Sequence, residues 1–270
     1  MKLEELERIR GIAVGIAEEA GALLLSGWQS RPVSKTKAAH NDIVTDYDRR
    51  AEELVVTRLR SAFPTHSIVG EEGAAVGDTK GECVWYVDPL DGTMNFAHGL
   101  PFFAAELGLM VGGVPAVGVV VAPVLGWTFS GTVGVGATRN GEVISVSRED
   151  TLGRALIATG FPSVPDDPTA NVAEWVACMK QTHGPRRLGS AALDLAALAC
   201  GWFDVHFERN VGPWDIAGGA AIVMAAGGQV TDYDGGKFDP RTGRIIASNG
   251  VLHADTVAML GAVEQRTGSI

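Results

Sequence analysis

The sequence predicts a layered protein of the α+β class, and three observations support this prediction. Apolar residues recur with helical spacing near the N-terminus, Val-rich runs fill residues 105–146, and beyond residue 151 short strand-like and helix-like runs alternate. Helices and sheets that each carry an apolar face must bury those faces against one another in layers. The alternation in the second half, taken alone, would also fit the α/β class. A chain of 270 residues forms one large domain or two closely packed ones.

Helices open the first half. Charged residues interleave with apolar ones at helical spacing over residues 2–28, which predicts an amphipathic helix and argues against a signal peptide; the apolar positions are Leu3, Leu6, Ile9, Ile12 and Ile16. A loop with Lys35 and Lys37 follows. A second helix is predicted over 46–62, closed by Phe63-Pro64.

Strands dominate the middle of the chain. Short strands at 67–69 and 84–87 each run into acidic residues. In the β-rich region, Asn140-Gly141 is a hairpin signal. The alternating second half is predicted as strands 155–158, 185–188, 203–207, 229–231 and 245–248 with helices 170–182, 190–200, 214–226 and 253–264.

Composition limits the function and the surroundings. Hydrophobic residues make up 46% and charged residues 20% of the chain, and the apolar run 114–124 is too short to span a membrane. The net charge of −10 argues against a nucleic-acid surface. The three cysteines are far apart and form no Cys-x-x-Cys pair, which is typical of thiols in a reducing compartment. We therefore expect a cytoplasmic protein that contacts neither membranes nor nucleic acid.

The most informative segment is residues 85–96, Trp-Tyr-Val-Asp-Pro-Leu-Asp-Gly-Thr-Met-Asn-Phe. A strand-like run delivers two carboxylates, Asp88 and Asp91, into a turn. Pro89 lacks a backbone N–H group and fixes φ, so we expect the strand to end at Asp88. The Gly-Thr pair that follows permits a tight backbone and supplies a hydroxyl where a helix opens. Two like charges repel in such a turn, and a hard cation with oxygen ligands removes that conflict.

Two distant acidic segments strengthen this metal hypothesis. Gly-Glu-Glu-Gly at 70–73 follows a short strand, and Asp215 is predicted in the first turn of the helix that begins at Trp214. Taken alone, the first is an ordinary solvated loop and the second an ordinary acidic residue at a helix start. Together with the segment at 85–96, they predict a site for divalent cations, which would also let an acidic protein bind phosphate.

Three segments, in this order, resemble the inositol monophosphatase family: Gly-Glu-Glu at 70–72, Trp-x-x-Asp-Pro-Leu-Asp-Gly-Thr-x-Asn-Phe at 85–96 and Trp-Asp-x-Ala-Gly at 214–218. The likeness runs from Lys37 to Glu208 and beyond, over nearly the whole chain. The resemblance implies a five-layered αβαβα sandwich of two subdomains, which we place at 1–150 and 151–270, with the site between them.

The resemblance also implies a reaction, the hydrolysis of a phosphate monoester by water with two or three Mg²⁺ ions per site. The implied metal ligands are Glu71, Asp88, the carbonyl of Leu90, Asp91 and Asp215. Thr93, paired with Asp48, resembles the hydroxyl that orients the nucleophilic water, because a hydroxyl is not basic enough to act alone. The resemblance also implies that Glu71 is a third catalytic residue.

The implied substrate contacts come from both halves of the chain. Backbone N–H groups of Gly92 and Thr93 would hold the phosphate, and Glu208 would accept hydrogen bonds from a polyol. Further substrate contacts carried over are Asp91, Gly189, Ser190, Ala191 and Asp215. Lys37 is a candidate for organising a third metal ion, and His98 for bordering the pocket or packing a loop.

Several alternatives stay open at this stage. Similar scaffolds hydrolyse inositol monophosphates, fructose 1,6-bisphosphate, histidinol phosphate and 3′-phosphoadenosine 5′-phosphate, and some family members are regulatory partners of the transcription machinery. A haloacid-dehalogenase-type phosphatase is disfavoured, because its two aspartates are two positions apart and those here are three. Family members are commonly dimers. Apolar residues within 105–124 would serve either a homodimer interface or an ordinary core: Leu107, Leu109, Met110, Val114 and Val117.

Overall fold

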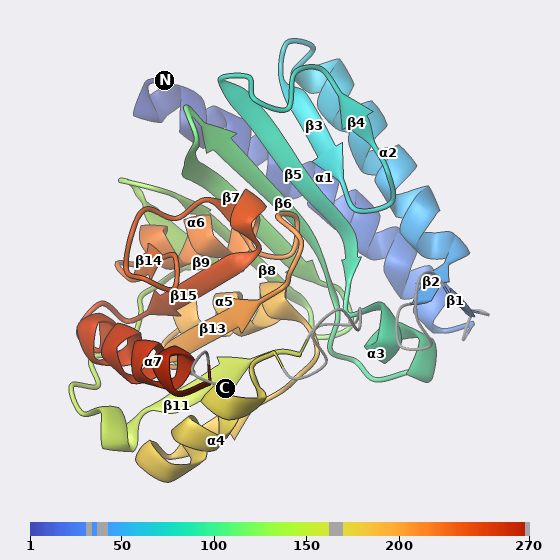
Figure 1. Cartoon of the computed structure of the whole chain (residues 1–270). Coiled ribbons are helices and arrows are strands. Elements are labelled where there is room, and N and C mark those ends of the chain that lie inside the picture. Colours follow the sequence, from blue (N-terminus) through green and yellow to red (C-terminus); the bar gives the residue numbers. More distant parts are fainter. Residues whose placement is uncertain (31–33, 37–42, 162–169, 268–270) are drawn as a thin grey trace.

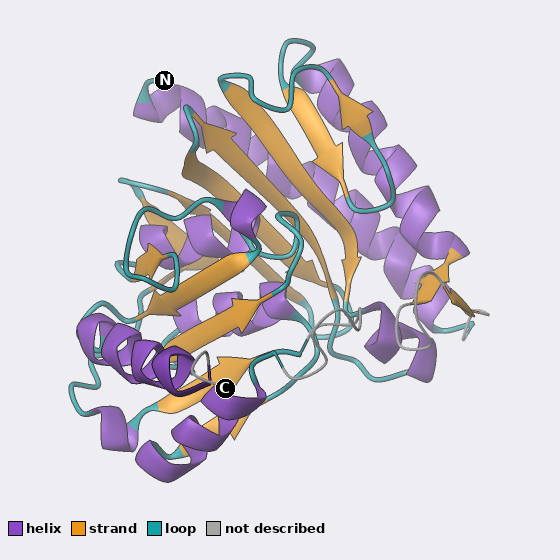
Figure 2. Cartoon of the chain, viewed as in Figure 1, coloured by secondary structure: helices purple, strands orange, loops and turns teal. Residues whose placement is uncertain are grey.

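The structure is a computed structural model that describes residues 1–30, 34–36, 43–161 and 170–267. Two sheets of different size, each flanked by helices, make up most of it (Figures 1 and 2). The elements of the first half are α1 (Leu3–Trp28), β1 (Ser34–Thr36), β2 (Ile43–Thr45), α2 (Asp46–Ala62), β3 (Ser67–Gly70), β4 (Ala75–Val76), β5 (Cys83–Asp91), α3 (Thr93–His98), β6 (Ala104–Val111), β7 (Val114–Ala122), β8 (Trp127–Thr132), β9 (Gly136–Arg139) and β10 (Glu142–Ile144).

The second half begins with a short 3₁₀ helix, and another follows β14. Its elements are η1 (Leu152–Arg154), β11 (Leu156–Thr159), α4 (Val172–Gln181), β12 (Gly184–Arg186), α5 (Ala191–Ala199), β13 (Val205–Arg209), α6 (Ala217–Ala225), β14 (Gln229–Thr231), η2 (Pro240–Thr242), β15 (Arg244–Ser248) and α7 (His253–Thr267).

Apart from β1 and β2, which pair with each other, the strands form a large sheet in the first half and a smaller one in the second. The large sheet has the order β10-β9-β8-β7-β6-β5-β3-β4, and the small one β12-β11-β13-β15-β14. Helices α1 and α2 cover one face of the large sheet, α5 and α6 lie between the sheets, and α4 and α7 cover the outer face of the small one. The five-layered αβαβα sandwich is therefore confirmed. The sheets divide near residue 150, although the subdomain boundary itself stays a prediction.

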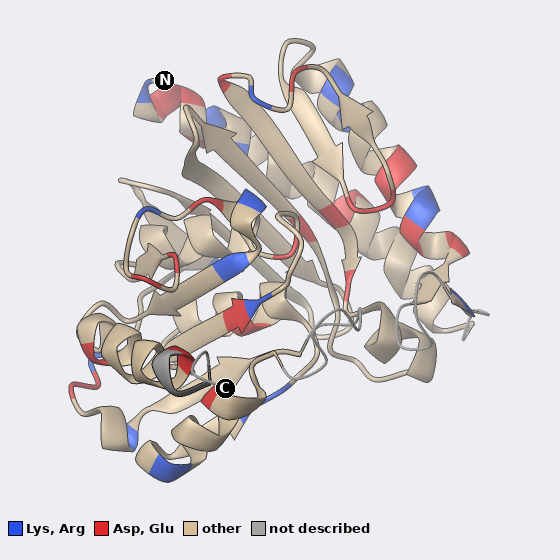
Figure 3. Cartoon of the chain, viewed as in Figure 1, with Lys and Arg blue, Asp and Glu red and all other residues tan. Residues whose placement is uncertain are grey.

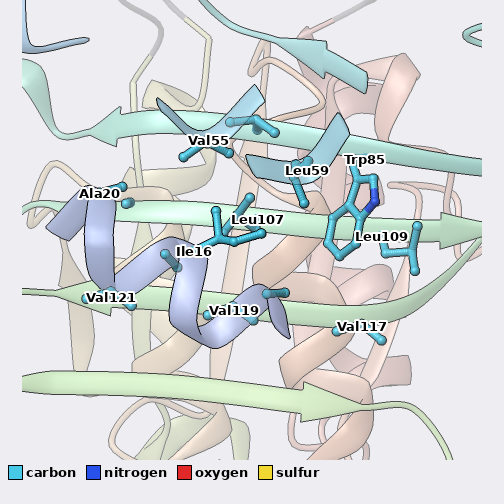
Figure 4. Close-up of a cluster of buried hydrophobic side chains, with 14 of the residues drawn as sticks. Ile16, Ala20, Val55, Leu59, Trp85, Leu107, Leu109, Val117, Val119 and Val121 are labelled. Atoms are coloured by element: carbon cyan, nitrogen blue, oxygen red, sulfur yellow. The ribbon is translucent and has the colours of Figure 1, made fainter. Parts of the chain in front are cut away.

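The outer core lies between α1, α2 and the large sheet, as Figure 4 shows. Ile16 and Ala20 of α1 face the valines of β7, and Trp85 of β5 is fully buried beneath α2. The residues considered for a dimer interface belong mostly to the monomer's own interior, since Leu107, Leu109, Met110 and Val117 are buried and Val114 alone is exposed. They give no argument for a dimer.

Glycines allow α6 to lie directly on the large sheet. A Cβ atom at Gly118 of β7 would lie 2.0 Å from the carbonyl oxygen of Gly218, and one at Gly108 of β6 would lie 2.4 Å from the Gly218 nitrogen. Real Cβ atoms do not approach other atoms so closely. These glycines thus permit the start of α6 to lie against the large sheet.

The end of β5 differs from the prediction. The strand does not stop at Asp88, because pairing with β6 resumes at Asp91 after a bulge in which Asp88 faces Glu106 and Asp91 faces Ala104. The bulge accommodates Pro89, which has no N–H group to donate to the ladder. Gly92 then adopts φ 89°, a left-handed conformation, and α3 begins at Thr93 as predicted.

Other boundaries also shift. Lys35 lies in the short strand β1, not in a loop, and Glu208 lies inside β13, not beyond its end. Asp215 was predicted in the first helical turn, but α6 begins only at Ala217. Asp215 lies in a turn just before the helix, where its carboxylate accepts a hydrogen bond from the Gly212 N–H group at 2.7 Å. No helix in the described part of the chain is long and apolar enough to cross a membrane.

Candidate active site

A cavity of about 390 Å³ opens between the two sheets, and residues of both halves line it. From the first half come Ile43, the end of β5 and the start of α3; from the second come the start of α5, Glu208 and the loop before α6. Figure 3 shows acidic positions at the carboxyl end of β5, where the cavity lies. The lining includes Glu71, Asp88, Leu90, Asp91, Gly92, Thr93, Gly189, Ser190, Ala191, Glu208 and Asp215.

Asp48 and Thr93 are brought together by the start of α2. Thr45 and Asp48 form a capping box, in which the N–H group and hydroxyl of Thr45 donate to Asp48 Oδ2 at 2.8 and 2.6 Å. The other oxygen, Oδ1, lies 3.0 Å from the Thr93 hydroxyl, which is also 3.0 Å from the Leu90 carbonyl. Burial raises the pKa of Asp48. The predicted Thr93–Asp48 pair is thus present, and helix capping holds its carboxylate in place.

Asp88 lies at the centre of a group of carboxylates. Its side chain is only 1% exposed, and one oxygen accepts the Leu90 N–H group at 2.9 Å. Burial raises the pKa of Asp88 well above its usual range, and the negative charges of Glu71, Asp91, Asp215 and Glu106 raise it further. The charges that act most strongly on Asp88 are therefore all negative.

Asp91 joins the two halves of the molecule. Its Oδ2 atom accepts hydrogen bonds from the Ser190 hydroxyl at 2.6 Å and from the Ala192 N–H group at 2.7 Å, at the start of α5. Nearby, the Asn95 side-chain amide donates to the Leu188 carbonyl at 2.9 Å. Burial raises the pKa of Asp91 to about 6, although these hydrogen bonds oppose the shift. The segment around Ser190 is thus held against the carboxyl end of β5.

Asp215 faces the same group from the loop before α6. Burial first, and then the charges of Glu71 and Asp91, raise its pKa well above the usual range. The structure therefore brings together the four acidic side chains that the sequence selected from three distant segments. Among the described residues, however, no three acidic, histidine or cysteine side chains already converge closely enough to hold a metal ion.

The far side of the cavity carries a second pair of carboxylates. Glu208 of β13 and Asp194 of α5 are 6% and 1% exposed. Asp194 Oδ1 is buried without a hydrogen-bond partner among the described residues, and His206 Nε2 lies 3.7 Å from Glu208 Oε2. Burial raises the pKa of Glu208 to about 8, while Arg187 opposes the shift. Gly160 lies against this carboxylate, since a Cβ there would be 2.0 Å from Glu208 Oε1. This end of the cavity suits a ligand that donates several hydrogen bonds.

Sequence reasoning missed Asp194, Arg187 and Glu106. No local motif marks them, and a helical spacing pattern treats Asp194 as a polar interruption of an Ala/Leu run. Of the two weaker candidates, His98 is exposed at the end of α3 and does not line the cavity. Lys37 lies outside the described residues.

Comparison with known proteins identifies the family. The model of the inositol monophosphatase family matches residues 5–265. The chain belongs to the inositol monophosphatase family. Since the match spans nearly the whole chain and several relatives are named as phosphatases, this member of the family is a phosphoric monoester hydrolase.

Individual relatives agree on the fold and differ in name. The chloroplastic phosphatase IMPL1 of Arabidopsis thaliana is 41% identical over 89% of this chain and 67% of its own length. The putative Nus factor SuhB of Neisseria meningitidis serogroup B is 40% identical over 91% of this chain and 95% of its own. The structure of inositol monophosphatase from Anabaena (Nostoc) sp. superposes with a TM-score of 0.86, at 39% identity, and covers 96% of this chain and 97% of that one.

Proposed function

We propose that this member of the inositol monophosphatase family hydrolyses the phosphate ester of a small polyol, with inositol monophosphate as the first candidate. One observation carries the proposal: a single cavity joins the acidic group around Asp88, the Thr93–Asp48 pair and the carboxylate of Glu208. These are the parts that a metal-assisted attack of water on a phosphate monoester requires.

The acidic group suits divalent cations with a preference for oxygen ligands. Buried carboxylates with raised pKa values and only negative charges as their strongest neighbours are stabilised by a cation. We assign Glu71, Asp88, Asp91, Asp215 and the Leu90 carbonyl as the residues that would hold two or three Mg²⁺ ions. When bound, Mg²⁺ neutralises phosphate charge and lowers the pKa of water.

The Thr93 hydroxyl orients the nucleophilic water in this proposal. The Thr93 hydroxyl donates a hydrogen bond to Asp48, which leaves the Thr93 oxygen free to accept a hydrogen bond from the water. Because the capping box occupies the other Asp48 oxygen, the carboxylate keeps one orientation. The N–H groups of Gly92 and Thr93 carry over as phosphate contacts at the same end of the cavity.

The second half of the chain binds the leaving group in this proposal. Glu208 accepts hydrogen bonds from neighbouring hydroxyls, and the small residues Gly189, Ser190 and Ala191 let the backbone approach the ring. This arrangement favours a polyol over the other candidates, which are fructose 1,6-bisphosphate, histidinol phosphate and 3′-phosphoadenosine 5′-phosphate. Steady-state kinetics on these four substrate types, with Mg²⁺ and with EDTA, test the proposal. The highest kcat/KM on a substrate without a polyol, or full activity in EDTA, would reject it.

A regulatory role is the second candidate, and the similarity to a putative Nus factor favours it. In this reading the chain binds the transcription machinery without using its cavity. Sedimentation with purified RNA polymerase tests it, with Asp91→Asn as a variant that separates binding from catalysis. A regulatory role requires that the Asp91→Asn variant still binds RNA polymerase.

Assembly and location are also proposals. We propose a homodimer from the family resemblance alone, and light scattering at micromolar concentration that gives a monomer would reject it. The three cysteines are free thiols, which supports a reducing, cytoplasmic setting.

A further inference from the structure

Two buried glutamates, Glu52 and Glu106, lie outside the cavity lining and have no part in the chemistry described so far. Glu52 belongs to α2 and is 7% exposed, and Glu106 belongs to β6 and is fully buried. Burying a carboxylate costs several kcal/mol unless it is hydrogen-bonded, so each of the two should have hydrogen-bond partners that offset this cost.

Glu106 caps helix α6 from the neighbouring sheet. Its Oε1 atom accepts the Gly219 N–H group, in the first turn of α6, at 2.6 Å. The residue at the N-cap position, Ile216, makes no side-chain hydrogen bond, so Glu106 takes the place of an N-cap side chain. Gly218 leaves room for this contact, because a Cβ there would lie 2.7 Å from Glu106 Oε1.

The position of this cap links it to the acidic group. Glu106 faces Asp88 across the β5–β6 pair, and Asp215 precedes α6 by two residues. The cap therefore ties the segment that carries Asp215 to the strand that lies beside Asp88. The second Glu106 oxygen, Oε2, is buried without a hydrogen-bond partner in the described structure, and such an unsatisfied acceptor destabilises the folded protein.

Glu52 has the same relation to Glu71. Its two oxygens accept the N–H groups of Glu72, at 2.9 Å, and Ala74, at 3.0 Å, in the turn that follows Glu71. A Cβ at Gly70 would lie 2.1 Å from Glu52 Oε2, so a glycine is required there as well. In both places a buried glutamate reaches past a glycine and holds the backbone next to a carboxylate that lines the cavity.

We propose that Glu52 and Glu106 are positioning residues that set the cation affinity of the cavity by fixing the segments of Glu71 and Asp215. The inference rests on the proposed function, because it takes these two carboxylates as cation ligands. Groups that orient metal ligands typically change metal affinity about 10- to 100-fold when they are removed.

The test compares isosteric variants by their response to Mg²⁺ in the absence of substrate. Glu106→Met and Glu52→Met keep the side-chain volume and remove the acceptor, whereas Glu106→Gln and Glu52→Gln keep one acceptor oxygen. Asp204→Leu is the matched control, because Asp204 is also a buried carboxylate that accepts a backbone N–H group, that of Leu156 at 2.8 Å, but does not line the cavity. The apparent Kd for Mg²⁺ is taken from the Mg²⁺-dependent rise in the thermal unfolding midpoint, measured from an EDTA baseline.

We expect all Met and Leu variants to unfold at lower temperature in EDTA. Only Glu106→Met and Glu52→Met should also raise the apparent Kd for Mg²⁺, by about 10- to 100-fold, and each Gln variant should lie between its Met counterpart and the wild type. If one Met variant does not fold, the other pair decides the same question.

Three results would overturn the inference. The first is a Kd within twofold of wild type in the Met variants, and the second is an equal rise in Asp204→Leu. The third is an equal effect of Met and Gln at both positions, because only Gln keeps an acceptor. A wild type whose unfolding does not respond to Mg²⁺ would instead reject the metal part of the proposed function and this inference with it.

Discussion

Replacing Glu208 by Gln tests whether this carboxylate accepts hydrogen bonds from the hydroxyls of the leaving group. The side chain is buried and lines the cavity, so a bound polyol would supply hydrogen-bond donors to it. A hydrogen bond to a charged group contributes about 1.5–3 kcal/mol. Its loss corresponds to a decrease of roughly 10- to 140-fold in kcat/KM.

The raised pKa of Glu208 adds a pH dependence to this magnitude. Since burial raises the pKa to about 8, the free carboxyl group is largely protonated at pH 7, where Gln resembles it closely. The loss should therefore be smaller at pH 7 and approach the upper part of the range at pH 9, where the wild-type group is ionised.

The assay compares kcat/KM for inositol monophosphate with that for p-nitrophenyl phosphate, an ester without ring hydroxyls. At pH 9, where the carboxylate is ionised, we expect Glu208→Gln to reduce the first at least tenfold and to leave the second nearly unchanged. Asp204→Asn, at a buried carboxylate away from the cavity, serves as the control. Equal losses on both substrates would refute the reasoning, because Glu208 would then support the fold or the acidic group and not the substrate.

Three further predictions follow from the same geometry. Asp91→Asn should abolish most turnover yet raise the free energy of unfolding in EDTA at pH 7 by up to about 3 kcal/mol, because burial raises the pKa of Asp91 to about 6 and so makes its charge unfavourable in the folded protein. A variant that is less stable than the wild type in urea would contradict this. Thr93→Val should lower kcat at least about 100-fold with little change in KM, because it removes the hydroxyl that Asp48 holds; near-normal kcat would argue that the pair is structural. The metal-free protein should lose stability as pH rises from about 4.5 to about 8, because unfolded Glu208 releases its proton near 4.5 whereas the folded side chain keeps it until about 8. The urea midpoint should fall less over this pH range in Glu208→Gln than in the wild type, and equal pH profiles for the two proteins would contradict the raised pKa.

The sequence allowed the acidic group and the layered fold to be predicted because both depend on local patterns. Three short segments carry the family resemblance, and every acidic side chain in them except that of Glu72 lines the cavity. The predictions that failed concern the exact ends of strands and helices. Pro89 was expected to end its strand, but a bulge accommodates it. Asp215 was expected in the first turn of a helix, but it lies in the turn just before α6.

The residues that were missed act over long distances in the chain. Glu106 and Gly219 are in contact although 113 positions separate them, and nothing next to Glu106 in the sequence indicates a helix to cap. The place of Asp194 in the cavity could not be predicted for the same reason, because only the folded chain places it beside Glu208. Contacts of this kind depend on the packing of two layers, which periodicity does not encode.

The position of α5 and α6 between the two sheets bears on how this protein can evolve. These helices belong to the second half, yet α6 covers the inner face of the first-half sheet, where Val120 and Phe129 are buried with Ile222 in one cluster. A fragment that ended near residue 150 would expose this apolar face to water and invite aggregation. Neither half is therefore a module that recombination can exchange between relatives.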